Sequence, residues 1–130
     1  MGAERRTSHK DLVLWQKSMD LAVETCRLAR GFPSFEMYGL GAQLRRAAVS
    51  VPSNVAEGTA RRTTREFISF LHIARGSLAE LETQVFLARR LGYLDDTMAL
   101  TVSPKIDEVG RLLNATIRGL QRRLDPPPSS

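Results

Sequence analysis

Residues that form disulfides, bind metals or stack on bases are scarce in this chain. A single cysteine, Cys26, excludes an internal disulfide, and with only His9 and His72 beside it no Cys/His ligand cluster can form. No window approaches the roughly 18 uninterrupted apolar residues of a membrane span, and no apolar stretch of signal-peptide kind follows the charged N-terminus. We therefore expect a cytoplasmic protein in a reducing compartment, with no membrane, metal or cofactor.

Strand signals are also missing, because no useful length of the chain alternates apolar and polar residues. Six prolines and nine glycines divide the 130 residues into four stretches whose apolar residues recur every three or four positions. The first stretch follows Asp11, a predicted N-cap, and ends at Gly31; the second begins near Ser34 or Phe35 and ends at Gly58. Their predicted core faces are Leu12, Trp15, Met19, Ala22, Cys26 and Ala29, and Leu40, Leu44, Ala47, Val51 and Val55.

The third stretch has the clearest start signal, a capping box of Thr63 and Glu66, and it ends before Gly92. The fourth begins near Asp95 or Asp96, and Pro104 marks either its first turn or a break. Their predicted core faces are Phe67, Leu71, Ala74, Leu78, Leu81, Val85 and Ala88, and Val102, Ile106, Val109, Leu113, Ile117, Leu120 and Leu124.

Four amphipathic helices with short connections predict an all-α protein, an antiparallel up-down-up-down four-helix bundle over residues 11–124. We expect the polar segment 1–10 and the Pro-rich tail 125–130 to be disordered. The second and third helices are long for a monomer of this size, which favours an oligomer.

Positive charge is in modest excess, with 19 Lys and Arg against 14 Asp and Glu, and 16 of the cations are Arg. Around the second helix and the following turn lie Arg45, Arg46, Arg61, Arg62 and Arg65. These arginines form either a solvated face or a phosphate-binding patch. No free aromatic platform or RNA-binding signature accompanies them, so any nucleic-acid binding should not depend on the base sequence. Arg122 and Arg123 lie in a last helical turn, where they complement the helix dipole.

Two polar stripes run beside the apolar faces of the second and third helices. We predict that they pair by interhelical hydrogen bonds and fix the register of the bundle. No base lies beside a nucleophile and no Glu-x-x-His pair occurs, so we expect neither catalysis nor a di-iron centre. The stripes are Gln43, Ser50, Asn54 and Glu57, and Ser77, Glu80 and Gln84.

Small residues follow the third helix on the side away from its predicted core. A glycine in mid-helix costs about 1 kcal/mol relative to alanine, so a packing role for Gly76 is one interpretation and simple tolerance is the other. Apolar neighbours on the same outer face favour a subunit interface. The candidate interface residues are Ile68, Ser69, Gly76, Ala79, Thr83 and Phe86.

Several runs occur together in an order that resembles a known family, the four-helix-bundle proteins encoded in 23S rRNA intervening sequences. They are Asp11–Lys17, Tyr38–Leu40, Gln43–Ala48, Ser50–Gly58, Phe67–Ala74 and Gly76–Gln84, within residues 11 to 94. The resemblance implies a small bacterial cytosolic protein that assembles as a homopentameric ring, with no biochemical activity assigned to most members. A related bundle, the accessory variability protein of diversity-generating retroelements, is similar to a basic pentamer that binds nucleic acid and a reverse transcriptase.

These observations lead to two expectations of function. The first is a non-enzymatic homo-oligomer whose Arg-rich surface binds RNA or DNA without sequence preference. The alternative is a protein-interaction scaffold, for example for a reverse transcriptase, whose Arg residues pair with acids of a neighbouring subunit or partner and which has no nucleic-acid role.

Overall fold

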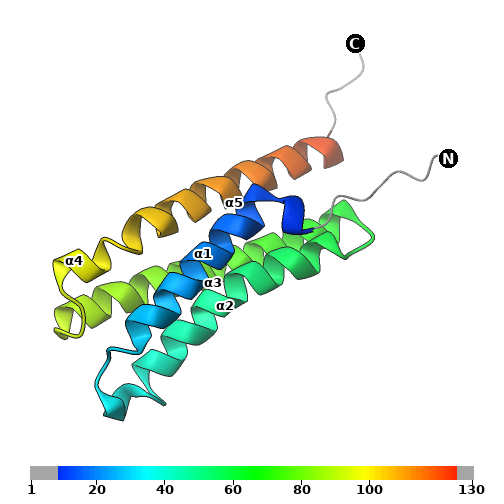
Figure 1. Cartoon of the computed structure of the whole chain (residues 1–130). Coiled ribbons are helices and arrows are strands. Elements are labelled where there is room, and N and C mark those ends of the chain that lie inside the picture. The colour runs from blue at the N-terminus through cyan, green and yellow to red at the C-terminus, as the bar shows by residue number, and fades with distance from the viewer. Residues whose placement is uncertain (1–8, 126–130) are drawn as a thin grey trace.

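The computed structural model describes residues 9–125, in which all regular elements are helices (Figure 1). The predicted all-α helical bundle is confirmed. Its four long helices are α1 (Val13–Ala29), α2 (Leu40–Thr59), α3 (Thr64–Arg90) and α5 (Ser103–Leu124); short helices are η1 (His9–Asp11), η2 (Ser34–Glu36) and α4 (Asp96–Ala99). Of the segments expected to be disordered, 1–8 and 126–130 lie outside the described residues, whereas His9 and Lys10 belong to η1 and Asp125 follows α5.

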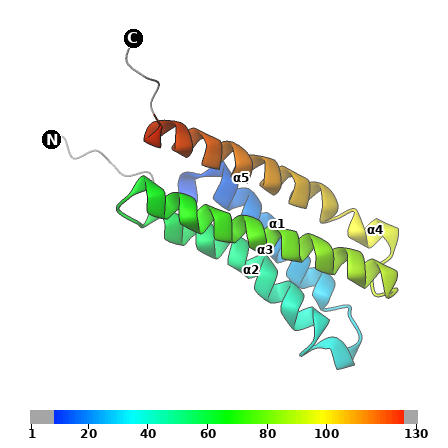
Figure 2. The ribbon, with the colours of Figure 1, turned by 180° about the vertical axis from the view of Figure 1, so that it is seen from behind.

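The long helices are arranged around one apolar centre. Helix α2 packs against α1 and α3, and α5 packs against the other sides of α1 and α3 (Figures 1 and 2). Near the start of α2 Gln43 faces Gln84, in the middle Ser50 faces Ser77, and at the end Gly58 faces Phe67. The start of α1, the α2–α3 turn and the end of α5 therefore come together at one end of the bundle.

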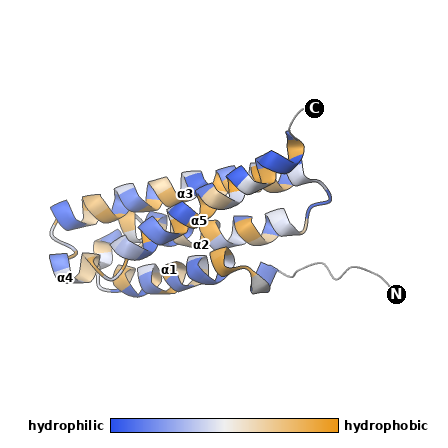
Figure 3. Cartoon of the chain, turned by 90° about the horizontal axis from the view of Figure 1, so that it is seen from above, coloured by the Kyte–Doolittle hydropathy of each residue, from blue (hydrophilic) through white to orange (hydrophobic). Residues whose placement is uncertain are grey.

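The core takes one apolar stripe from each long helix. Leu21, Leu44, Leu71, Leu81 and Leu113 are among the fully buried side chains. Hydrophobic and hydrophilic residues alternate along each helix in Figure 3, as the three-four spacing predicts. The predicted core face of α2 is buried throughout. The predicted faces of α3 and α5 are buried with one exception each, Phe67 on α3 and Leu124 on α5, which are partly exposed.

Both ends of α3 follow the sequence signals. The Thr63 hydroxyl accepts a hydrogen bond from the Glu66 backbone N–H (3.2 Å) and donates one to the Glu66 carboxylate (2.9 Å). At the other end Gly92 adopts a φ of +80°, and the N–H groups of Gly92 and Tyr93 bond back to the carbonyls of Arg89 and Ala88. This is the Schellman arrangement, in which a glycine closes the helix because it adopts the left-handed conformation without steric cost.

Two predicted helix starts are wrong. The N-cap of the first helix is Leu12 and not Asp11, because Asp11 belongs to η1 and α1 begins at Val13. The second helix begins at Leu40, because the chain forms η2 and Gly39 is not helical; the Glu36 carboxylate then accepts the N–H of Leu40 (3.0 Å).

The signals of the fourth stretch are confirmed, because α4 begins at Asp96 with Asp95 as its cap, and Pro104 lies in the first turn of a separate helix, α5. Proline lacks an N–H and therefore fits the start of a new helix better than the interior of a continuous one.

The predicted core face of α1 is right only in part: Ala22 and Ala29 are buried, and Leu12 and Trp15 pack against the core. Helix α1 buries Leu14, Leu21 and Leu28 at heptad spacing, whereas Trp15 and Cys26 are only partly buried and Met19 is exposed. Ser18 and Thr25 lie between these leucines on the same helix face, so the buried face of α1 contains polar residues and does not look like a core face in the sequence. Burial of Ser18 is possible because its hydroxyl donates to the Leu14 carbonyl (2.7 Å) within the helix.

Candidate nucleic-acid interface

The turn between α2 and α3 places two arginines at the end of the bundle. Gly58 lets the end of α2 approach α3 closely, since a Cβ atom there would lie 2.7 Å from Phe67 Cδ1 and 3.1 Å from Phe70 Cβ. The Thr63 cap fixes the exit from the turn. Arg61 and Arg62 therefore project from a turn held tightly at both sides.

The arginines around this turn differ in their partners. Arg61 is occupied twice, by Glu57 at 3.6 Å and by the face of the Phe70 ring, whose centroid lies 4.6 Å from the guanidinium carbon. Arg62 and Arg65 are exposed and form no ion pair within residues 9–125. Their guanidinium groups are available to an anion from outside the chain.

The end of α5 adds two more arginines beside the turn. Arg123 lines the same depression of about 340 Å³ as Arg61 and Arg62, and Arg122 precedes it on α5. Neither Arg122 nor Arg123 forms an ion pair in the described part of the chain. We call Arg61, Arg62, Arg65, Arg122 and Arg123 the arginine end; planar guanidinium groups of this kind bind phosphate oxygens in pairs.

The structure does not bring all five predicted phosphate-binding arginines together. Arg45 and Arg46 lie near the start of α2, and about 20 Å of helix axis separates them from its end at Thr59, after which Arg61 follows. Arg45 donates a hydrogen bond to the Met37 carbonyl (3.0 Å) beyond the start of α2. The predicted patch is therefore divided. Arg45 and Arg46 lie away from the arginine end, whereas Arg123, for which the sequence indicated only a helix-dipole role, lines the same depression as Arg61 and Arg62.

The two polar stripes face each other between α2 and α3. Ser50 and Ser77 share a hydrogen bond of 2.7 Å between their hydroxyl oxygens, and the Asn54 amide donates to the Ser50 hydroxyl (2.9 Å) and carbonyl (2.8 Å). Ser77 is buried, so this pair satisfies a hydroxyl that would otherwise lose its water without compensation. The interhelical pairing predicted from the stripes is present at these residues.

The remaining stripe residues take different places. Gln43, Glu80 and Gln84 line a cleft of about 350 Å³ with Arg46. The Gln84 side-chain oxygen is buried and has no hydrogen-bond partner among residues 9–125. We call this the polar cleft. Glu57 is not part of it, because its carboxylate is exposed and pairs with Arg61.

The outer face of α3 is exposed as predicted at five of six candidate interface residues: Ser69, Gly76, Ala79, Thr83 and Phe86. Ile68 is a correction, because only 8% of it is exposed and it belongs to the core cluster. Helix α3 packs against both α2 and α5, so its buried arc is wider than one three-four seam and includes Ile68.

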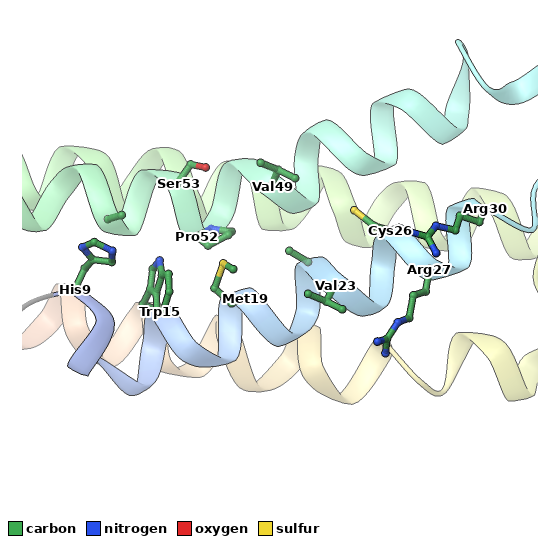
Figure 4. A pocket seen from close by; sticks show the side chains of 12 residues that line it. His9, Trp15, Met19, Val23, Cys26, Arg27, Arg30, Val49, Pro52 and Ser53 are labelled. Carbon is green, nitrogen blue, oxygen red and sulfur yellow. The ribbon is translucent and has the colours of Figure 1, made fainter.

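A groove between α1 and α2 was not predicted from the sequence. It measures about 640 Å³ and is lined mainly by apolar side chains, with Trp15 and His9 at one end and Cys26 and Arg30 at the other (Figure 4). The apolar residues that should have marked it, Trp15, Met19 and Cys26, were assigned to the core instead. We call it the α1–α2 groove.

Within residues 9–125, no three His, Cys, Asp or Glu side chains are grouped so that they could hold a metal ion. In the same range no helix has the length and apolar character needed to cross a membrane.

Comparison with known proteins gives a consistent result. The family model of the 23S rRNA-intervening sequence protein matches residues 10–115. A solved structure of a protein of unknown function from the S23 ribosomal protein family of Bacteroides thetaiotaomicron shares the fold, with a TM-score of 0.72 and 24% identity over 81% of this chain and 98% of that one. No curated protein matches the sequence. Since the family model spans most of the chain, the chain belongs to the 23S rRNA-intervening sequence protein family.

Proposed function

We propose that this protein is a non-enzymatic, self-associating bundle in antiparallel up-down-up-down order, which binds the phosphate backbone of RNA or DNA in the cytoplasm without sequence preference. The observation that supports the proposal is the arginine end. Four of its five guanidinium groups, those of Arg62, Arg65, Arg122 and Arg123, have no ion-pair partner within the described chain.

The chemistry of this end favours backbone contacts over base readout. Base recognition in single strands uses exposed aromatic faces, but Phe67 packs against Gly58 and the Phe70 face is covered by Arg61. Unpaired arginines without stacking platforms neutralise phosphates and release counterions. Several copies in one ring would repeat this surface and raise the avidity.

The test compares removal of charge at the arginine end with removal of the same charge elsewhere. The double variant Arg62→Gln and Arg65→Gln should bind a duplex more weakly and reduce the slope of log K against log salt by about 1 to 2, since each lost phosphate contact removes roughly one counterion. The control is Arg90→Gln with Arg111→Gln, which removes two exposed arginines that form no ion pair in residues 9–125 and lie away from the arginine end, and it should leave the slope unchanged. Equal effects of both changes, or binding that ignores salt, would refute the proposal.

The alternative, a protein-interaction scaffold, has one observation in its favour, the polar cleft with its unpartnered Gln84 oxygen. A partner that donates a hydrogen bond there would satisfy this buried atom. Charge reversal at Arg45 and Arg46 separates the two functions. Loss of assembly or of a protein partner with unchanged nucleic-acid binding would favour the scaffold.

A further inference from the structure

The end of the bundle opposite the arginine end carries uncovered aromatic rings. The connection between α1 and α2 lies there, away from the start of α1 and the end of α5 (Figure 1). Phe35 and Tyr38 in this connection are 75% and 91% exposed, and Tyr38 makes no ring contact within residues 9–125. Two neighbouring rings with this exposure offer free faces on which another flat group can stack.

The Phe35 ring is supported by a series of contacts. Its centroid lies 6.3 Å from that of Tyr93 in an edge arrangement, and the Tyr93 centroid lies 5.5 Å from that of the buried Phe32. The Tyr93 hydroxyl donates a hydrogen bond to the Glu36 carboxylate (2.9 Å), which holds Tyr93 in place. Because Phe35 is already partly ordered, a group that stacks on it loses less affinity to conformational entropy than one that must order a free ring.

A depression with two arginines lies beside these rings. It measures about 320 Å³, and its lining includes the residues directly adjacent in sequence to Phe35 and Tyr38. Arg30 and Arg45 line it together with apolar side chains, and within the described part of the chain no acidic side chain belongs to the lining. A concave surface with positive charge and no acid favours an anionic ligand.

Both guanidinium groups are available to such a ligand. Arg30 is exposed, and neither Arg30 nor Arg45 forms an ion pair within residues 9–125. The hydrogen bond from Arg45 to the Met37 carbonyl (3.0 Å) uses only one of its several N–H groups. The one acid of the connection, Glu36, pairs with neither arginine, because its carboxylate accepts a backbone N–H (3.0 Å) and the Tyr93 hydroxyl (2.9 Å).

Rings beside unpaired guanidinium groups match the chemistry of a single strand. Proteins bind single-stranded nucleic acid by stacking its bases on aromatic rings within a basic surface. A duplex is a poorer match, since its bases already stack on one another inside the helix. We propose that this end binds single-stranded RNA or DNA, with bases on Phe35 and Tyr38 and phosphate oxygens on Arg30 and Arg45.

We call these four residues the stacking end. The stacking end adds to the proposed function a second site for a different form of nucleic acid. The arginine end lacks a free ring and binds only the phosphate backbone, so the two sites differ in the ligand that they prefer.

The test removes the rings and keeps the apolar surface. Fluorescence anisotropy measures binding of a labelled oligouridylate of about 12 nucleotides to chains that carry Arg62→Gln and Arg65→Gln, which suppress binding at the arginine end. Adding Phe35→Leu and Tyr38→Leu should lower the affinity about five- to a hundredfold, as expected for the loss of stacked bases. The matched control, Phe35→Tyr with Tyr38→Phe, keeps both rings and should leave the affinity unchanged. Equal affinities of the leucine variant and this control would overturn the proposal.

An acidic peptide is the other ligand that unpaired arginines could bind. Polyglutamate should displace the oligouridylate poorly, because it has no flat group to stack on Phe35 and Tyr38. Displacement by polyglutamate as effective as that by unlabelled oligouridylate would overturn the proposal and favour an acidic protein partner.

Photochemical cross-linking locates the contact directly. Trypsin cleaves after Arg30 and Arg45 and therefore releases the whole connection, residues 31–45, as one peptide. An oligouridylate that contains 5-iodouridine should form an adduct with this peptide on irradiation, and the leucine variant should lose the adduct. Adducts confined to peptides from other parts of the chain would contradict the assignment.

A charge change tests the phosphate contact. Arg30→Gln should reduce the slope of log K against log salt for the single strand by about 1, whereas Arg111→Gln, an exposed and unpaired arginine on α5, should not change it. Equal slopes in these two variants would refute a role for Arg30. Duplex binding of Phe35→Leu with Tyr38→Leu in a chain that keeps Arg62 and Arg65 should equal that of the unmodified chain, so either proposal can fail while the other stands.

Discussion

Gly58→Ala should destabilise the bundle although alanine is the better helix former. The added methyl would lie 2.7 Å from Phe67 Cδ1 and 3.1 Å from Phe70 Cβ, so α2 and α3 must move apart at the turn. Overpacking of this kind costs about 1–3 kcal/mol, against at most about 1 kcal/mol from helix propensity. The net expectation is a loss of about 0–2 kcal/mol of unfolding free energy.

Gly119→Ala is the matched comparison, because a Cβ at Gly119 on α5 would meet nothing within 4 Å. Propensity alone should then act and stabilise the chain by about 1 kcal/mol. Urea titrations at one fixed chain concentration give both values, since self-association makes apparent stability depend on concentration. A Gly58→Ala variant as stable as Gly119→Ala would refute the close approach of α2 and α3.

Three further predictions concern named contacts. Ser50→Ala and Ser77→Ala should each lower stability by about 1 kcal/mol, and the double variant by less than their sum, in a double-mutant cycle of urea midpoints. Ile68→Ala should cost about 2–5 kcal/mol by the same assay, as for a core residue; a change near zero would place Ile68 on the surface. The pKa of Tyr93 is raised above its ordinary 10.0, first by the hydrogen bond that Tyr93 donates to Glu36 (2.9 Å), then by burial and then by the Glu36 charge. The stabilisation of the folded chain by this hydroxyl is therefore complete below about pH 10 and is lost as the pH rises through the raised pKa. The melting temperature of Tyr93→Phe should therefore lie below that of the unmodified chain at neutral pH and approach it at alkaline pH; a constant difference would contradict the assignment.

The cores of α2, α3 and α5 could be predicted from the sequence because each helix has one apolar seam that no polar residue interrupts. Helix α1 could not be predicted in the same way. Its apolar residues fill two seams, and Ser18 makes the buried one look polar although its hydroxyl is satisfied inside the helix. The uninterrupted apolar seam that contains Trp15, Met19 and Cys26 lines the α1–α2 groove instead.

The candidate site was predicted in part for a similar reason. Spacing along the chain places Arg61, Arg62 and Arg65 together, and the capped turn keeps them so. Spacing along the chain cannot show that the end of α5 returns to this turn and brings Arg123 beside Arg61 and Arg62. This arrangement depends on the packing of all four long helices. Proximity in the sequence likewise suggests one patch for Arg46 and Arg61, although most of the length of α2 separates them.

The most direct test of the central claim is the solution mass of the chain by light scattering, alone and with a short RNA duplex at low and high salt. The account predicts a multimer that gains the mass of the RNA at low salt and loses it at high salt, because phosphate contacts weaken as salt rises. A monomer, or a multimer whose mass is unaffected by RNA at low salt, would contradict it.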